Sequence, residues 1–317
     1  MKDSQNPEIT GVFTSFKDAC SSLRGDMSKT LVVAAAHDEY TLEAVYAAAN
    51  EFHIKYLLVG KREKIRAISS ELGNAPAAEG IIDGDDDEDC ARKAVGIIRE
   101  NGGDVLMKGL LETSILLKAV LDKENGIRDS SVMSHLAMLE VPNYHKVVTV
   151  TDGGMIANPT LEQKAAIVRN AVAFYRQLGF RRPKIVALCA SETVSERMPE
   201  TIDASKLQAM CERGELGDCL LEGPLSFDLA VSPESAKKKD FRSAVTGDAD
   251  ILLVPGIATG NIFCKGLIYW AGAKMAGCVV GAKSPIVVVS RGATPEEKLN
   301  SIMLCLATQQ EQGVQAV

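Results

Sequence analysis

Two polar residues follow a strongly apolar run near the end of the chain. The run 285–289 has the sequence Pro-Ile-Val-Val-Val, which is typical of a buried strand, and Ser290 and Arg291 come directly after it. A guanidinium group beside a hydroxyl group at a strand end is suited to hold a phosphate or an oxyanion. Glu297 stands three residues after Thr294, so it fits a helix capping box as well as a catalytic role.

The segment 151–163 offers a second combination of a strand end, glycines and polar side chains. It places Asn158, Pro159 and Thr160 after two adjacent glycines. Thr160 and Gln163 form a capping-box pattern, which explains part of the segment structurally. Because open α/β sheets bind ligands beyond the carboxyl ends of their strands, the segment is either a ligand-binding turn or a plain loop.

A third junction, 251–263, leads from an apolar strand through glycines into a helix. It contains Gly256, Thr259, Gly260 and Asn261. Free N–H groups at a helix start favour an anion, and Thr259 or Asn261 is suited to cap this helix. The alternative is a turn that joins strand and helix without a ligand.

A lysine ends the strand of the fourth junction. Lys108 closes the run 104–108, and Glu112, Thr113 and Ser114 open the helix that follows. A lysine in this place either extends its amine to the surface or contacts an anion at the edge of the sheet.

Other patterns indicate no specific chemistry. The chain lacks the dinucleotide fingerprint, the Walker sequence, the Gly-x-Ser-x-Gly elbow and any Cys-x-x-Cys pair, and its four histidines have no metal-binding spacing. We therefore predict no metal site and reduced, mostly buried cysteines. We interpret the acidic run 83–89 as a solvated helix start, and 237–239, three lysines, as a solvated helix face with at most a secondary role near a polyphosphate.

Short runs rich in Val, Ile and Leu alternate with longer segments of helical period. This pattern is typical of parallel strands joined by crossover helices. The predicted strands are 31–36, 55–59, 80–83, 104–108, 134–140, 146–151, 184–189, 219–222, 251–254 and 286–289. The predicted helices are 39–52, 61–72, 88–101, 112–121, 160–178, 203–213, 261–275 and 295–307.

The composition is that of a globular protein of about two domains. The 317 residues are 46% hydrophobic and 24% charged, with a net charge of −7. No apolar run approaches the roughly 18 residues of a membrane helix, and the first residues lack the apolar segment of an export signal. We therefore expect a cytoplasmic protein that binds neither membrane nor nucleic acid.

Five segments carry a specific combination of motifs. They are Met-Lys-Gly-Leu-Leu-Glu-Thr at 107–113, Asp152 with Ala-Asn-Pro-Thr at 157–160 and Glu-Gln at 162–163, Glu-Gly-Pro-Leu-Ser-Phe-Asp at 222–228, Val-Pro-Gly-Ile-Ala-Thr-Gly-Asn at 254–261, and Val-Ser-Arg-Gly at 289–292. Together they resemble the phosphate acetyltransferase and phosphate butyryltransferase family along most of the chain. The chain is more similar to the butyryl branch, because the acetyl branch carries Ser-Gly and His-Ser-Thr where this sequence has Lys-Gly at 108–109 and Glu-Thr-Ser at 112–114.

The resemblance implies an α/β protein of two α/β/α domains with mostly parallel sheets and an active cleft between them, a fold like that of isocitrate and isopropylmalate dehydrogenases. The first domain would comprise 1–140 plus 291–317 and the second 141–290. The resemblance also implies a homodimer or a higher homo-oligomer.

Residue by residue, the resemblance implies that Ser290 and Arg291 form a catalytic pair. The catalytic aspartate of the family, seven residues beyond the serine, corresponds to Glu297, which is one methylene longer. Thr113 matches a serine at a helix start, and Lys118 matches an arginine after a shift of one residue. Lys108 is a further candidate for a catalytic cation. The remaining candidates for substrate binding are Asn158, Pro159, Thr160, Asp228, Thr259, Gly260 and Asn261.

The implied reaction moves an acyl group between coenzyme A (CoA) and inorganic phosphate. Phosphate that is held close attacks the thioester directly in a ternary complex, while helix N–H groups, Arg291 or Lys108 stabilise the oxyanion. In the reverse direction Glu297 takes the thiol proton. CoA is therefore a substrate, and no tightly bound cofactor or metal is expected.

Three other functions stay open. The nearest is a phosphate acetyltransferase. More remote are an oxidative decarboxylase that depends on NAD(P) and a metal, with a similar two-domain architecture, and a non-catalytic protein that binds small anions.

Overall fold

The computed structural model describes residues 13–18, 29–290 and 292–308. The contacts divide the chain into two compact units. Of the described residues, unit 1 comprises 13–18, 134–274 and 308, and unit 2 comprises 29–133, 275–290 and 292–307. Compared with the predicted domains, this division assigns 134–140 to the unit that holds 141–274, and it assigns 275–290 to the other.

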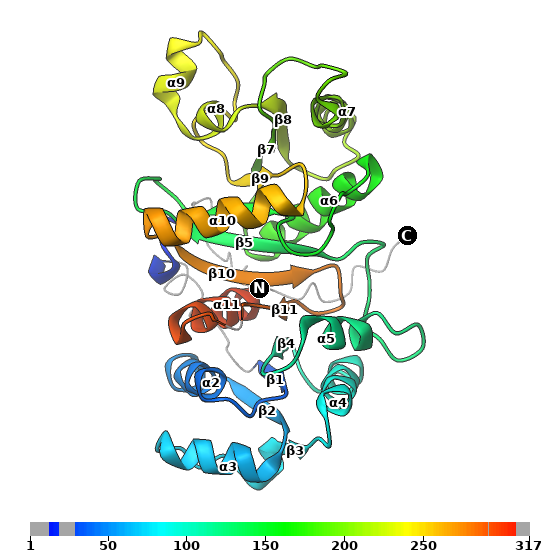
Figure 1. Ribbon diagram of the computed structural model, residues 1–317, viewed down its shortest axis with the longest axis vertical. Helices are drawn as coiled ribbons and strands as arrows, with labels where there is room; N and C mark the ends of the chain where they lie inside the picture. Colours follow the sequence, from blue (N-terminus) through cyan, green and yellow to red (C-terminus); the bar gives the residue numbers. More distant parts are fainter. Residues whose placement is uncertain (1–12, 19–28, 291, 309–317) are drawn as a thin grey trace, which may run out of the picture. The chain divides into compact units, whose positions relative to one another are not determined.

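Unit 2 has a sheet with the strand order β3-β2-β1-β4-β11-β10 (Figure 1). The pairs β1–β2, β1–β4, β2–β3 and β4–β11 are parallel, whereas β10–β11 is antiparallel. The strands are β1 (Thr30–Ala34), β2 (Lys55–Gly60), β3 (Ile81–Asp83), β4 (Val105–Lys108), β10 (Lys274–Val280) and β11 (Ile286–Val287).

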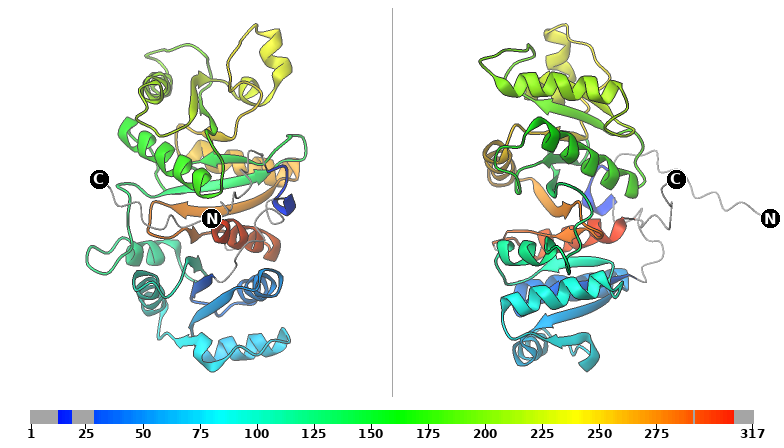
Figure 2. Two further views of the ribbon diagram at one scale, coloured as in Figure 1. Left: turned by 180° about the vertical axis from the view of Figure 1, so that it is seen from behind. Right: turned by 90° about the vertical axis from the view of Figure 1, so that its right-hand side faces the viewer.

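The helices of unit 2 cover both faces of its sheet. Helices α2 and α11 pack together on one face, with α3 beside α2, and α4 and α5 pack together on the other (Figures 1 and 2). Val32, Leu58 and Leu106 on the strands and Ile65 on α3 are fully buried. The helices are α2 (Glu39–Phe52), α3 (Arg62–Glu71), α4 (Asp87–Arg99), α5 (Thr113–Val120) and α11 (Pro295–Ala307), with a short 3₁₀ turn at Ala78–Gly80.

Unit 1 has the strand order β5-β6-β9-β7-β8, with β5–β6 antiparallel and the other pairs parallel. Helices α6 and α7 contact each other on one face, and α10 contacts β6 on the other (Figure 1). The elements are β5 (Ser134–Glu140), β6 (Val148–Thr151), α6 (Leu161–Gln177), β7 (Lys184–Leu188), α7 (Pro199–Glu212), β8 (Leu220–Leu225), α8 (Phe227–Val231), α9 (Pro233–Lys238), β9 (Ile251–Leu253) and α10 (Ile257–Ala271).

The predicted α/β architecture with mostly parallel strands is confirmed. The helix predicted at 261–275 is wrong at both ends, because α10 begins four residues earlier, at Ile257, and ends at Ala271. Gly272 ends it in the left-handed conformation, with φ of 67°. Strand β10 follows and was not predicted; its first two residues, 274 and 275, fall within the predicted helix. Within the described ranges, no helix is both long enough and apolar enough to cross a bilayer.

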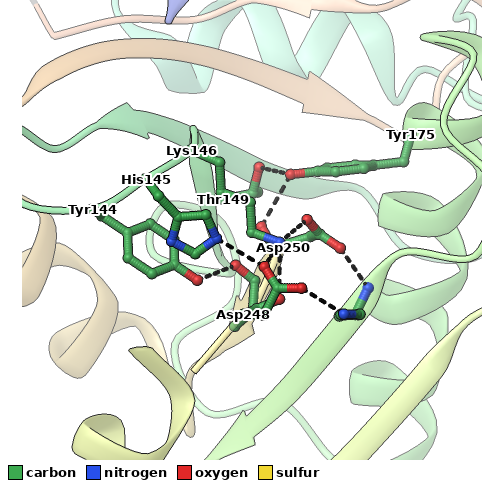
Figure 3. A network of polar contacts seen from close by, with 9 residues as sticks. Tyr144, His145, Lys146, Thr149, Tyr175, Asp248 and Asp250 are labelled. Carbon is green, nitrogen blue, oxygen red and sulfur yellow. Dashed lines mark hydrogen bonds and ion pairs between the residues drawn. The ribbon is translucent and has the colours of Figure 1, made fainter. Parts of the chain in front are cut away.

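An ionic network around the buried Lys146 ties the amino ends of three strands of unit 1 together (Figure 3). Lys146 precedes β6, Lys184 begins β7, and Asp250 precedes β9. The Lys146 side chain is only 1% exposed, and its Nζ lies 2.6 Å from Asp250 Oδ1 and 2.7 Å from Asp248 Oδ1. The other oxygen of Asp250 accepts a hydrogen bond from the Lys184 backbone N–H at 2.7 Å.

The Asp248 carboxyl titrates far from its ordinary range. Burial raises its pKa, but hydrogen bonds from Lys146, Lys184 and His145 outweigh burial and hold the pKa of Asp248 well below its usual value. A carboxyl with a lowered pKa in the folded state contributes stability above its unfolded pKa of about 3.9, and this contribution is lost as the pH falls through the folded pKa.

We predict that Lys146→Met destabilises the protein by about 3 kcal/mol, because it leaves two carboxylates without their buried cation. Urea unfolding at pH 7 measures this. Lys238→Met is the matched control, because Lys238 pairs with Glu234 on the surface, and it should cost less than about 1 kcal/mol. Equal effects of the two substitutions would contradict a stabilising role for the network.

Asp248→Asn should make the free energy of unfolding fall less steeply below about pH 4 than it does in the wild type, because the variant lacks the carboxyl whose pKa folding lowers. Urea unfolding across this pH range measures the difference.

Candidate active site

The predicted site residues form two groups, one in each unit. In unit 1 they follow the carboxyl ends of β6, β8 and β9, and in unit 2 those of β4 and β11. Parallel strands carry their carboxyl ends to the same edge of a sheet, so the topology gathers each group at one edge.

A buried carboxylate holds the loop after β6. Asp152 is 2% exposed, and its Oδ1 accepts hydrogen bonds from the backbone N–H groups of His135 (3.2 Å), Gly154 (2.9 Å) and Met155 (3.0 Å). Its Oδ2 accepts a fourth from Ile156 at 3.0 Å. Asp152 therefore fixes the path of the chain that leads to Asn158, a role that the motif did not reveal.

Two glycines let this loop approach the start of α10. A Cβ atom on Gly260 would lie 2.7 Å from Gly153 Cα, and one on Gly153 would lie 3.0 Å from the Gly260 carbonyl carbon. The Ile257 N–H also donates to the Ala157 carbonyl at 3.2 Å. The loop after β6 and the turn after β9 are thus joined through their backbones, as the glycines at both junctions suggested.

The start of α10 presents N–H groups without a capping side chain. Gly256 is the N-cap residue, so the prediction that Thr259 or Asn261 caps the helix is wrong, because both lie within its first turns. Among the described residues, no acceptor is bonded to the N–H groups of Ala258 or Thr259. The side chains of Thr259 and Asn261 are exposed. This helix start is therefore suited to bind an anion.

The start of α6 lies in the same loop. The capping box predicted there is confirmed: Thr160 Oγ1 accepts from the Gln163 N–H, and Gln163 Oε1 accepts from the Thr160 N–H at 2.9 Å. The Thr160 hydroxyl also donates to Glu162 Oε2 at 3.0 Å, so the fold itself uses this side chain. Pro159 is buried, whereas Asn158 is exposed.

Asp228 lies in the first turn of α8 and pairs with a cation. Its Oδ2 is 3.1 Å from Lys239 Nζ. Hydrogen bonds from Ser226 and Lys239 lower the pKa of Asp228 below its ordinary value. Helix α8 reaches α10 through Phe227, whose ring stands edge-on to that of Phe263 with centroids 5.0 Å apart.

In unit 2, Lys108 is buried rather than extended to the surface. It is 4% exposed, and its Nζ donates to the carbonyl oxygens of Gly109 and Leu111, both at 3.1 Å. The Gly109 N–H donates to the Ala34 carbonyl at 2.8 Å, and a Cβ on Gly109 would lie 2.3 Å from Ala35 O. The turn after β4 is therefore locked against the end of β1.

Helix α5 separates two of the predicted residues. Thr113 is its first residue, and Lys118 is exposed in its last turn. At 1.5 Å per residue they lie about 7.5 Å apart along the helix axis. Within unit 2 the structure places Thr113, but not Lys118, at the end of α5 that follows Lys108.

The segment after β11 carries the predicted catalytic pair. Ser290 is exposed, and its Oγ accepts from the Gly292 N–H at 3.4 Å. Arg291 lies outside the described residues. The capping box at the start of α11 is confirmed, since Glu297 Oε2 accepts from the Thr294 N–H at 2.8 Å and Thr294 Oγ1 accepts from the Glu297 N–H at 3.2 Å. The catalytic role of Glu297 stays a prediction.

A buried lysine beside Glu297 was missed by the sequence reasoning. Lys298 is 5% exposed and donates to Thr41 Oγ1 at 3.3 Å. Burial lowers the pKa of its amine, and the nearby Asp38 carboxylate offsets part of that change. The helical spacing of Lys298 with Ile302 and Cys305, both buried, was the available signal. Across the described residues, no group of three or more His, Cys, Asp or Glu side chains could hold a metal ion.

Comparison with known proteins decides the family. The family model described as Phosphate acetyl/butaryl transferase matches residues 86–306. The chain belongs to this family. It is 39% identical to the probable phosphate butyryltransferase of Bacillus subtilis over 93% of this chain and 98% of that protein. It is 38% identical to the phosphate acetyltransferase of Thermotoga maritima over 87% of this chain and 94% of that one.

A solved structure agrees with this membership. The branched-chain phosphotransacylase from Enterococcus faecalis superposes with a TM-score of 0.79 at 30% identity, over 88% of this chain and 98% of that one. A 4-hydroxythreonine-4-phosphate dehydrogenase from Klebsiella pneumoniae has a TM-score of 0.54 at 14% identity, over 89% of this chain and 100% of that one, which is a likeness of fold alone.

We predict opposite effects for two glycine-to-alanine changes in α10. Gly260→Ala should destabilise the protein by about 1–3 kcal/mol, since the added methyl would push against Gly153. Gly266→Ala meets nothing within 4 Å and should stabilise it by up to about 1 kcal/mol, as alanine favours the helix. Urea unfolding of both variants measures this. Equal stability of the two would show that the glycine contact does not constrain the loop.

Proposed function

We propose that the protein is a phosphate butyryltransferase, which converts butanoyl-CoA and phosphate to butanoyl phosphate and CoA. The observation that carries the proposal is the start of α10, where the N–H groups of Ala258 and Thr259 have no acceptor among the described residues and the loop after β6 is held close through its backbone. Family membership supports the reaction class. A phosphate acetyltransferase is the second candidate, because the Thermotoga relative of that name is nearly as similar as the Bacillus one.

In this proposal the unit 1 group binds inorganic phosphate. A dianion gains from the positive end of the α10 dipole and from unbonded N–H groups. The hydroxyl of Thr259 and the amides of Asn158 and Asn261 add donors around it. Phosphate reacts slowly with a thioester in water, so holding it in line with the carbonyl supplies a large part of the rate.

The unit 2 group acts on the thioester and the thiol. Ser290 and Arg291 stabilise the tetrahedral oxyanion formed when a phosphate oxygen attacks the carbonyl carbon. The C–S bond then breaks, and the thiolate receives, through Glu297, the proton that the attacking hydrogen phosphate releases. In the reverse direction Glu297 removes that proton, the sulfur attacks, and the C–O bond to phosphate breaks.

The proposal requires that both groups act on one pair of substrates. We propose a two-domain fold of the isocitrate dehydrogenase type as the arrangement that meets this requirement.

Thiol release from butanoyl-CoA, followed with a thiol reagent with and without phosphate, tests the function. Release that depends on phosphate and yields a hydroxylamine-reactive acyl phosphate is the expected result. Reduction of NAD(P) with a 2-hydroxy acid would favour the decarboxylase instead, and anion binding without turnover would favour a binding protein. The ratio of kcat/KM for butanoyl-CoA to that for acetyl-CoA separates the two transferases.

Glu297→Gln tests the base. Glutamine fits the same capping box, so α11 should keep its start and the melting temperature should not change. The variant loses the group that accepts the proton, and kcat in the direction of butanoyl-CoA synthesis should fall on the order of 100-fold or more, with little change in KM for CoA. Glu296→Gln, one residue earlier, is the control. Unchanged turnover in Glu297→Gln would remove Glu297 from the mechanism.

We also propose that the protein is a homodimer that associates through α10. Ile262, Tyr269 and Trp270 on this helix are 72%, 82% and 93% exposed. They present about 500 Å² of side chain, a large share of the roughly 800 Å² that each partner buries in a standard interface. Lys265 is the single charged residue of the helix, so two copies can meet with little charge to desolvate.

Trp270→Glu should convert the dimer to a monomer in light scattering after gel filtration, because it places a carboxylate in the apolar contact. Tyr40→Glu, at an aromatic residue that is 56% exposed in unit 2, should leave the dimer intact. Trp270 is also the only tryptophan of the chain, so its emission should shift to the red when the wild type is diluted. A wild type that is monomeric at micromolar concentration would contradict the proposal.

A further inference from the structure

Two cysteines of unit 1 bring their sulfur atoms together. Cys211 lies in the last turn of α7, and Cys219 directly precedes β8. Their Sγ atoms are 3.6 Å apart, and the Cys211 thiol also donates to the Cys219 carbonyl oxygen at 3.4 Å. Both cysteines are free. Because the sulfur atoms of a disulfide lie about 2.05 Å apart, these two need to approach by only about 1.5 Å to be bonded.

The backbone fixes the turn between the two cysteines. Gly214, just beyond α7, is in the left-handed conformation with φ of 76°, and its N–H donates to the Cys211 carbonyl at 2.9 Å. The Glu215 N–H donates to the Met210 carbonyl at 3.0 Å, so a Schellman motif ends the helix. Leu216, the next residue, is fully buried and anchors the turn to the core. The fold itself therefore holds the two thiols next to each other.

Solvent access distinguishes this pair from a second pair of neighbouring cysteines. In unit 2, Cys278 on β10 and Cys305 on α11 are hydrogen-bonded to each other, but they are 3% and 0% exposed, so a dissolved oxidant has little access to either. Cys211 is only half-buried, whereas Cys219 is 6% exposed. Burial and the neighbouring Cys211 sulfur raise the pKa of the Cys219 thiol to about 12. Cys211 is therefore the thiol of its pair that an oxidant in solution reaches first.

We propose that Cys211 and Cys219 form a reversible oxidation site, at which a low-molecular-weight disulfide converts the two thiols into one intramolecular disulfide. The Cys211 thiolate attacks one sulfur of the small disulfide, whose S–S bond breaks, and the first small thiol leaves. Cys219 then loses its proton, and its sulfur attacks the Cys211 sulfur, so that the second small thiol leaves. The protein loses two electrons and two protons, and the small disulfide is reduced to two thiols. An excess of a dithiol reverses both steps.

The new bond joins the end of α7 to the start of β8. Helix α7 already packs against β8, and the Gly223 N–H donates to the Gln208 side chain at 3.2 Å, so the bond forms between elements that are in contact (Figure 1). A disulfide restricts the unfolded chain, and oxidation should therefore raise the melting temperature on the order of 5 °C. Cys219 lies at the amino end of β8, whereas the proposed substrate group follows the carboxyl ends of the strands. The inference does not rest on the proposed function.

Mass spectrometry of the full chain after incubation with oxidised glutathione tests the site. Trypsin cleaves after Arg213, so Cys211 and Cys219 fall in separate peptides, 207–213 and 214–237. We expect the two peptides to be joined, with a mass two hydrogen atoms below their sum, and to separate when dithiothreitol is added. Glutathione on either peptide without a link between them, or two unreacted thiols, would overturn the site. A linked protein whose melting temperature does not rise would overturn the connection of α7 to β8.

Single variants test the order of the two steps. In Cys219→Ser, Cys211 should remain a mixed disulfide with glutathione, because the second sulfur is missing. In Cys211→Ser, the buried Cys219 should stay a thiol. Cys189→Ser is the control, because it removes another half-buried cysteine of unit 1, and it should form the link like the wild type. Glutathione on Cys219 in Cys211→Ser would contradict the order, and loss of the link in Cys189→Ser would overturn the pairing.

Discussion

The approach of two glycines, Gly153 and Gly260, is the constraint on which the unit 1 group depends. Side chains at these positions would separate the loop after β6 from the start of α10. The buried carboxylate of Asp152 holds that loop by four backbone N–H groups, so its shape does not depend on a ligand. A preformed set of N–H donors costs little reorganisation when an anion binds, and this makes the helix start suitable for catalysis on phosphate.

The two edges of the unit 1 sheet have different roles. At the amino ends of the strands, Lys146, Lys184 and two aspartates form a closed ionic network with every charge partnered (Figure 3). At the carboxyl ends, the side chains of Asn158, Thr259 and Asn261 are exposed. The ionic network therefore stabilises the edge at the amino ends, and side chains that can bind a ligand lie at the edge of the carboxyl ends. Unit 2 differs at the turn after β4, because there the amine of Lys108, at the carboxyl end of the strand, is buried and donates to two backbone carbonyls.

The sequence-based predictions were most accurate for elements whose boundaries depend on neighbouring residues. Helices α2 and α11 have the predicted bounds, because Asp38 and Thr294 stand directly before them and supply side chains for their starts. Strand β10 was missed because it is stabilised by pairing with β11, and the local sequence of β10 does not reveal that partner. At the site, motifs located the loops, but not the partners of Asp152, Lys108 and Lys298. Those partners come from other segments or depend on how each turn closes, which spacing does not encode.

Phosphate itself, rather than a protein nucleophile, attacks the thioester in this account. Exchange of labelled CoA into butanoyl-CoA in the absence of phosphate tests that claim most directly, since exchange requires the acyl group to rest on the protein. The expected result is no exchange above the rate without protein, together with rapid exchange once phosphate is added. Exchange at a rate comparable to turnover without phosphate would demonstrate a covalent acyl-enzyme, for which the chain offers several cysteines, and would contradict direct transfer.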